Sequence, residues 1–171
     1  RDDVDERPLR QERHGIIGEY KRPPHTVAEY EAQHGGPVYK ENPDKCCHDN
    51  KVTVLEKAAV GWDAWMSGIR RDQSAARRTT RIFERGGDGI YKVSPLAAWS
   101  SEDVDGYIRR YGLPVHPLTS QGYPSIGCKP CTRAVGAAAD SRAGRWAESD
   151  KTECGIHEDY WRTQGSRGPA T

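Results

Sequence analysis

The sequence has little of the apolar material that builds a large core or crosses a membrane. Of its 171 residues, 35% are hydrophobic, with a single phenylalanine and a single methionine. Mean hydropathy is −0.90. No apolar run approaches the roughly 20 residues that a membrane-spanning helix needs, and the first residues have no apolar signal-peptide core. These shortages predict a soluble, cytoplasmic protein with no membrane partner.

An excess of one charge is also missing. Lysine and arginine number 26 against 25 aspartates and glutamates, which leaves a net charge of +1. A protein that binds nucleic acid over its whole surface carries a clear positive excess, so we expect no nucleic-acid partner. An arginine-rich stretch at 70–81 could still form a local basic site. It contains no interleaved aromatic residues of the kind that stack on bases.

Hydrophobic spacing and turn residues predict a mixture of helices and strands. Helices are expected at 26–31, 50–59 and 101–111, and strands at 63–69 and 90–93. Asp49 or Asn50 is expected to cap the second helix, and Ser100 with Asp103 forms a near capping box for the third. The strand at 63–69 is a short apolar run, which is typical of a buried strand.

The two ends of the chain differ from the middle. Residues 1–26 mix prolines and charges of both signs without a helical or strand period, and we interpret them as a disordered or foreign leader. Residues 165–171 are expected to form a flexible tail. The folded domain is therefore predicted at 27–164.

Four of the five cysteines fall into two pairs. Cys46 and Cys47 are adjacent, and Cys128 and Cys131 form a C-x-x-C. An odd number of cysteines without an export signal indicates a reducing compartment, where cysteines bind metal or do chemistry. A vicinal pair fits a zinc knuckle poorly and an iron–sulfur cluster better, because each sulfur can bind a different iron. We favour a cluster, with zinc and unligated thiols as the alternatives.

The fifth cysteine, Cys154, stands in a different setting. It lies in the run Glu153-Cys154-Gly155-Ile156-His157, beside a histidine and downstream of arginines. Nearby cations favour the thiolate, which is the nucleophilic form of cysteine. The pattern predicts a catalytic nucleophile, and the alternative is an inert structural thiol.

Six blocks of the sequence carry a family resemblance. They are 45–52, 65–74, 91–96, 122–133, 142–146 and 151–157. In order and spacing they resemble the APS/PAPS reductases, in particular the iron–sulfur branch of assimilatory adenylyl-sulfate (APS) reductases. The resemblance covers about residues 27–160. The opening strand and the Ser-Gly-Gly-x-(Asp/Glu)-Ser phosphate loop that such proteins usually have are not in this sequence.

The resemblance implies a fold and a reaction. The fold is α/β, a Rossmann-related parallel sheet of the adenine-nucleotide alpha-hydrolase type flanked by helices and lacking its N-terminal part. The reaction is reduction of APS to sulfite and AMP by this oxidoreductase, with thioredoxin as partner and an S-sulfocysteine intermediate. The alternatives are a PAPS (phosphoadenylyl sulfate) reductase and a truncated, non-catalytic iron–sulfur or zinc module.

The resemblance also assigns residues. Cys154 is implied to be the nucleophile, and Cys46, Cys47, Cys128 and Cys131 the ligands of a [4Fe–4S] cluster. The basic residues implied to contact the anionic substrate are Lys51, Arg142, Arg145 and His157, with Arg71 and Arg77 near the nucleotide phosphates. Without the resemblance, each of these basic residues would be interpreted as an ordinary solvated surface charge.

Overall fold

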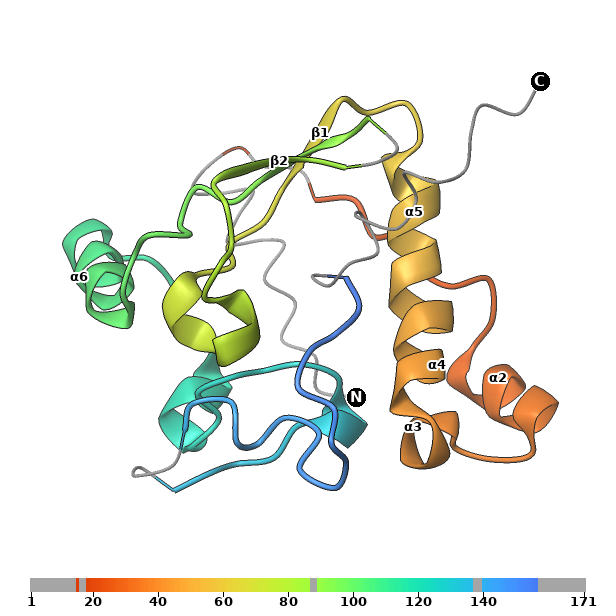
Figure 1. The fold of residues 1–171 in the computed structure, drawn as a ribbon. Coiled ribbons are helices and arrows are strands. Elements are labelled where there is room, and N and C mark those ends of the chain that lie inside the picture. Colours follow the sequence, from red (N-terminus) through yellow and green to blue (C-terminus); the bar gives the residue numbers. More distant parts are fainter. Residues whose placement is uncertain (1–14, 16–17, 87–88, 137–139, 157–171) are drawn as a thin grey trace.

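The computed structural model describes residues 15, 18–86, 89–136 and 140–156, and Figure 1 shows their arrangement. Helices fill the first part, a small sheet follows, and a loop-rich region returns to the first helices. The predicted α/β class is confirmed. No helix within these ranges combines the length and the apolarity needed to span a bilayer.

One long helix carries the first cysteine pair. It consists of α4 (Pro43–Cys47), the π-helical turn η1 (His48–Val52) and α5 (Thr53–Ala59), which follow one another without a break. The side chain of Asn42 caps its start by accepting the backbone N–H of Lys45 at 2.9 Å.

The predicted start of this helix at Asp49 or Asn50 is wrong. Pro43 occupies the first helical turn, where proline needs no N–H partner, so the residues interpreted as a turn begin the helix. Asn50 is a residue of the helix interior, and its side-chain amide donates to the Cys46 carbonyl at 3.0 Å. As a result, Cys46, Cys47 and Lys51 all lie on one rigid element.

The predicted N-terminal helix is confirmed as α2 (Val27–His34), and α3 (Val38–Glu41) follows it. Thr26 and Glu29 form a complete capping box, and Gly35 ends α2 with φ of 74°, a left-handed conformation that favours glycine. The hydroxyl of the buried Tyr30 donates to Asp49 at 2.8 Å. This contact fastens α2 to the long helix.

The sheet has three strands in the order β1–β3–β2. β1 (Ala64–Met66) runs parallel to β3 (Tyr91–Val93), whereas β2 (Phe83–Arg85) runs antiparallel to β3. The expected parallel sheet is thus confirmed for one pair only. The link from β2 to β3 is too short for a crossover, and Gly86 donates to Ile90 across it at 2.8 Å, as in a hairpin.

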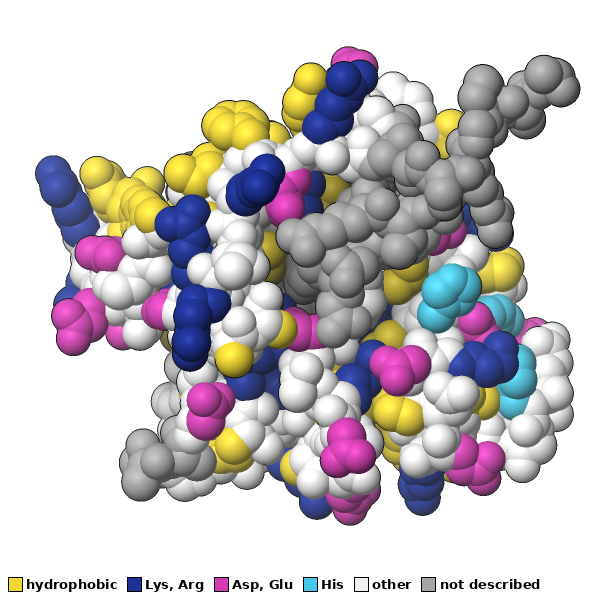
Figure 2. Space-filling model, viewed as in Figure 1, with side chains coloured by type: hydrophobic (Ala, Val, Ile, Leu, Met, Phe, Trp, Pro, Cys, Tyr) yellow, Lys and Arg dark blue, Asp and Glu magenta, His cyan; other side chains and the backbone are white. Residues whose placement is uncertain are grey.

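One face of the sheet is not covered by the described residues. Met66, Phe83 and Tyr91 lie on this face and are 71%, 68% and 46% exposed. Figure 2 shows hydrophobic side chains along the upper edge of the molecule, over the sheet. The prediction of a buried strand is therefore wrong: β1 ends at the exposed Met66, and the buried residues of the predicted run, Ser67 and Ile69, lie beyond it.

The helix predicted at 101–111 is confirmed as α6 (Ser101–Tyr111). Ser100 and Asp103 form the capping box, and Gly112 ends the helix with φ of 57°. No residue of α6 is fully buried. The remaining elements are short 3₁₀ turns: η2 (Arg71–Gln73), η3 (Ala75–Arg77), η4 (Pro117–Gln121) and η5 (Lys129–Cys131).

Replacing Ser100 with alanine should destabilise α6. The hydroxyl accepts the N–H of Asp103 at 3.1 Å, and losing such a cap typically costs about 1 kcal/mol. Urea unfolding followed by circular dichroism should report this loss, and Ser101→Ala, one residue later and without a capping role, serves as control. Equal stability of the two variants would contradict the cap.

Candidate active site

Cys154 lies at the centre of the cysteine-rich region. It is 8% exposed and packs with Cys47 and Trp146, with Cys131 and Ile156 against the same cluster. Residues far apart in the sequence are thus brought together from the long helix, from η5 and from the C-terminal segment. All five cysteines are free thiols.

Lys51 projects from the long helix into this region. Its Nζ donates to the sulfur of Cys154 at 3.8 Å. Burial disfavours the ammonium, but the sulfurs of Cys128, Cys154 and Cys47 outweigh it, so the pKa of Lys51 is raised. Lys51 therefore stays positively charged beside the sulfurs of Cys47, Cys128 and Cys154.

The four cysteines expected to bind metal face one region. Cys46 and Cys47 end α4, whereas Cys128 precedes η5 and Cys131 ends it, with the Cys131 N–H donating to the Cys128 carbonyl at 2.9 Å. Burial raises the pKa of Cys46, and Cys128 and Cys131 raise it further, because each disfavours a second thiolate nearby. The two pairs are thus within electrostatic reach of each other.

The surroundings of the two cysteine pairs include two hydrogen-bond donors, the indole of Trp146 and the ammonium of Lys51. In the described ranges, no three His, Cys, Asp or Glu side chains are grouped closely enough to hold a metal ion. Trp146 is buried against Cys47, and its indole N–H finds no acceptor among the described residues. Thiolate and sulfide sulfurs of a cluster accept hydrogen bonds, so this donor and the Lys51 ammonium fit such a group.

The pKa of Cys154 is lowered to about 5. A hydrogen bond from the Cys47 thiol is the largest cause; burial opposes it, and the Ile156 N–H, Lys51 and Lys151 add to the lowering. A Cys47 that binds iron has no proton to donate. The backbone N–H and the two lysines then remain to stabilise the thiolate.

Trp146 is the platform for three cations. Arg145 lies 4.5 Å from the ring centroid, Lys151 5.6 Å and Arg142 5.9 Å. The backbone of Trp146 has φ of 49°, which is unusual for a residue with a side chain. Attraction between cations and the ring gathers like charges beside Cys154.

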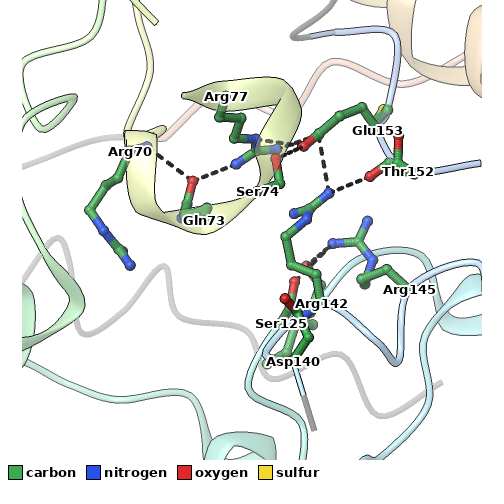
Figure 3. A network of polar contacts seen from close by, with 12 residues as sticks. Arg70, Gln73, Ser74, Arg77, Ser125, Asp140, Arg142, Arg145, Thr152 and Glu153 are labelled. Atoms are coloured by element: carbon green, nitrogen blue, oxygen red, sulfur yellow. Dashed lines mark hydrogen bonds and ion pairs between the residues drawn. The ribbon is translucent and has the colours of Figure 1, made fainter. Parts of the chain in front are cut away.

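Glu153, next to Cys154 in the chain, organises the buried polar network in Figure 3. Its carboxylate is 2% exposed and accepts from Arg77 Nε at 2.8 Å and Nη2 at 2.6 Å. Ser74 donates to it at 2.9 Å and Arg142 at 3.1 Å. Burial would raise the pKa of Glu153, but Arg77 and its neighbours outweigh this effect and lower it.

The predicted substrate-binding arginines have different surroundings. Arg77 and Arg142 are directed at Glu153, and Arg142 also donates to the Thr152 carbonyl at 3.0 Å. Arg71 donates to the Thr80 carbonyl at 2.8 Å. Only Arg142 and Arg145 among the four lie over Trp146 beside Cys154.

Arg145 is held by the loop that precedes the C-x-x-C. It donates to Ser125 at 3.3 Å and to the Ile126 carbonyl at 3.2 Å, while its Nε has no partner among the described residues. A Cβ on Gly127 would come within 2.2 Å of its guanidinium, so a larger residue at this position would displace the Arg145 side chain. His157 lies outside the described residues.

Sequence reasoning missed three residues of this site, namely Ser74, Lys151 and Glu153. All three belong to blocks that carried the family resemblance, 65–74 and 151–157, which was the available signal. Ser74 and Glu153 are 79 residues apart, and no spacing rule connects them.

A family model described as the phosphoadenosine phosphosulfate reductase domain matches residues 9–134. The chain belongs to this family. The match begins inside the segment 1–26, which the sequence had suggested to be foreign to the family. The predicted relationship to the APS/PAPS reductases is confirmed.

Two relatives in this family are named adenosine 5'-phosphosulfate reductase. The protein of Streptomyces coelicolor is 46% identical over 138 residues, which cover 79% of this chain and 58% of the relative. That of Oceanobacillus iheyensis is 46% identical over 140 residues, 80% of this chain and 58% of the relative. The chain thus spans little more than half the length of these relatives.

A solved structure in the same family also resembles this chain. It is a phosphoadenylyl-sulfate reductase from Candida auris in a phosphate complex, with a TM-score of 0.53 and 28% sequence identity. The similarity covers 63% of this chain and 53% of that one.

The network around Glu153 should make stability depend on pH. Because the folded-state pKa of Glu153 is lowered, its stabilisation is present above the ordinary glutamate pKa of about 4.3 and is lost as pH falls below it. Glu153→Gln should cost about 3 kcal/mol of unfolding free energy at pH 7, since it leaves buried guanidiniums without their carboxylate. The difference from wild type should shrink on acidification.

Urea unfolding between pH 7 and pH 3 would measure this linkage. Glu148→Gln is the matched control, because Glu148 is a 75% exposed glutamate paired with Arg133. It should change stability little at any pH. A Glu153→Gln deficit that stays constant down to pH 3 would contradict the ionised network.

Proposed function

We propose that this chain carries out the thiol chemistry of an assimilatory APS reductase, reducing adenylyl sulfate to sulfite and AMP with thioredoxin as electron donor. The observation that carries the proposal is the placement of Cys154. It is a buried thiol of lowered pKa, next to Lys51 and the two cysteine pairs, in a member of this reductase family. Free thiols suit a reducing compartment, so we place the reaction in the cytoplasm.

In the first step the Cys154 thiolate attacks the sulfur of the APS sulfate group. A sulfur–sulfur bond forms, the bond from that sulfur to the bridging phosphate oxygen breaks, and AMP leaves with the electron pair. The product is an S-sulfocysteine on Cys154. This division into two displacements is typical of nucleophilic catalysis.

In the second step a thioredoxin thiolate attacks the Cys154 sulfur and sulfite departs. The second thioredoxin thiol then breaks the mixed disulfide and regenerates Cys154. The two electrons that reduce the sulfur come from the thioredoxin dithiol.

The basic residues balance charge in the first step. A thiolate approaching an anionic phosphosulfate is repelled, and fixed cations offset this repulsion. Lys51 lies at the sulfur itself, and the Nε of Arg145, beside Trp146, has no partner in the described part of the chain. We propose that Lys51, Arg142, Arg145 and His157 contact the substrate. For Arg71 and Arg77, contact with the nucleotide phosphates stays a prediction.

Cys46, Cys47, Cys128 and Cys131 would hold the [4Fe–4S] cluster in this proposal. The bound cluster would supply a fixed electrostatic environment next to the sulfate. Within the chain, Lys51 lies close to Cys47, Cys128 and Cys154, and its ammonium offsets negative charge on their sulfurs. Because Lys51 lies on the same long helix as Cys46 and Cys47, its ammonium contacts the Cys154 sulfur from a defined place relative to that pair.

Anaerobically purified protein should be brown and contain about four irons and four sulfides per chain. Changing Cys46, Cys47, Cys128 or Cys131 to serine should remove the colour, because each thiolate binds one iron. Cys154→Ser should retain it. Iron, sulfide and zinc analysis with visible absorption measures the outcome, and one zinc without iron would contradict the cluster.

Incubation with APS in the absence of thioredoxin should add one SO₃ group to Cys154. Mass spectrometry of the peptide that contains Cys154 detects the adduct, and thioredoxin should then release it as sulfite. Cys154→Ser should abolish the adduct while the cluster persists. Arg145→Ala should weaken its formation about tenfold or more, because it removes a contact to a charged group.

Parallel incubation with PAPS tests the runner-up reaction. We expect APS to be preferred, in keeping with the two named relatives. Faster adduct formation from PAPS would favour that reaction instead, for which the Candida auris neighbour is the supporting observation. Intact cluster with no adduct from either nucleotide would leave a non-catalytic metal-binding module.

A further inference from the structure

The carboxylate of Glu153 joins three separate segments. Arg77 reaches it from η3, Ser74 from the residue just before that turn, and Arg142 from the turn at 140–146. Both oxygens are used: one accepts from Ser74 and Arg77 Nε, and the other from the Nη2 atoms of Arg77 and Arg142. Figure 3 shows these donors converging on one side chain.

The arginines that hold Glu153 are themselves fixed. Arg77 is 8% exposed, and its third nitrogen donates to Gln73, whose amide oxygen also accepts the N–H of Arg70. Arg142 holds the chain at a second point through the Thr152 carbonyl. The backbone on the N-terminal side of Cys154 is therefore held at two consecutive residues.

This anchorage determines where the thiol lies. Cys154 is one residue beyond the carboxylate, and its sulfur is directed to Lys51 on the long helix, an element that does not contribute to the network. Without Glu153, the segment before Cys154 would lose its ionic anchor. Displacements of about 1 Å at a reacting group can cost about 100-fold in rate.

We propose that Glu153 is a positioning residue, whose carboxylate, bound by Arg77, Arg142 and Ser74, fixes the segment that presents Cys154 to Lys51 and the substrate. The inference rests on the proposed function in that Cys154 is taken as the nucleophile. Glu153 itself touches no reacting atom. Its contribution is to the geometry of the attack, so the rate of the chemical step depends on it more than substrate affinity does.

The first test measures adduct formation on Cys154 in single turnovers with APS. Glu153→Gln should slow the maximal rate about 100-fold, with half-saturation by APS changed less than about threefold. Glu153→Asp keeps the charge on a shorter stem and should fall between wild type and Glu153→Gln. Glu148→Gln, an exposed glutamate five residues earlier, should behave as wild type.

The second test needs neither nucleotide nor thioredoxin. Wild-type Cys154 is 8% exposed, so iodoacetamide should label it slowly. Release of the anchor in Glu153→Gln should speed labelling of the Cys154 peptide about tenfold, with Glu148→Gln unchanged. Circular dichroism and iron content verify that the compared variants are folded and loaded.

Ser74→Ala gives a milder change if Glu153→Gln does not fold, because it removes one donor and leaves both arginines in place. It should give smaller changes in the same directions. Unchanged labelling and adduct rate in the folded variants would overturn the proposal, as would a loss confined to APS affinity. If wild type forms no adduct, the proposed function fails, and faster labelling of the variants still establishes the anchor.

Discussion

The buried carboxylate of Glu153, shared by two guanidiniums, is the interaction on which the site depends. The segments it joins are loops and single 3₁₀ turns, and the sheet consists of three strands of three residues each. Backbone ladders therefore supply little rigidity there, and charge-assisted hydrogen bonds supply it instead. Desolvating one carboxylate and two arginines is costly, and the arrangement persists because every oxygen has donors on it.

A second constraint is the long helix, which places the vicinal cysteines and Lys51 on one rigid body. The sulfurs raise the pKa of Lys51, whereas Lys51 helps to lower the pKa of Cys154. The sulfurs favour the ammonium of Lys51, and the ammonium favours the thiolate of Cys154. The ring of Trp146, which packs against Cys154, attracts the cations of Arg145 and Lys151 to the same site. The thiolate of Cys154 and the surrounding cations thus stabilise one another's charged forms beside the buried ring of Trp146.

Local signals in the sequence predicted part of this structure. Helices α2 and α6 were predictable because their caps and stops lie within a few residues of each other, and the cysteine pairs were predictable from spacing. The start of the long helix was missed because Pro43 suits both a turn and a first helical turn. The exposure of Met66 could not be predicted, because strand pattern does not specify what covers it. The roles of Arg77 and Arg142 were missed since their partner, Glu153, lies beyond any local period.

The π-helical turn His48–Val52 determines how the two α-helical ends of the long helix are rotated relative to each other. A π turn holds one more residue than an α turn, so it shifts the angular phase between the two α-helical ends. If the same five residues formed a regular α-helix instead, the vicinal cysteines would be rotated relative to α5 by most of the roughly 100° that one helical residue spans. The helix would look sound while its sulfurs faced away from the second pair. The π turn therefore sets the rotation between α5 and the end of the helix that carries Cys46 and Cys47.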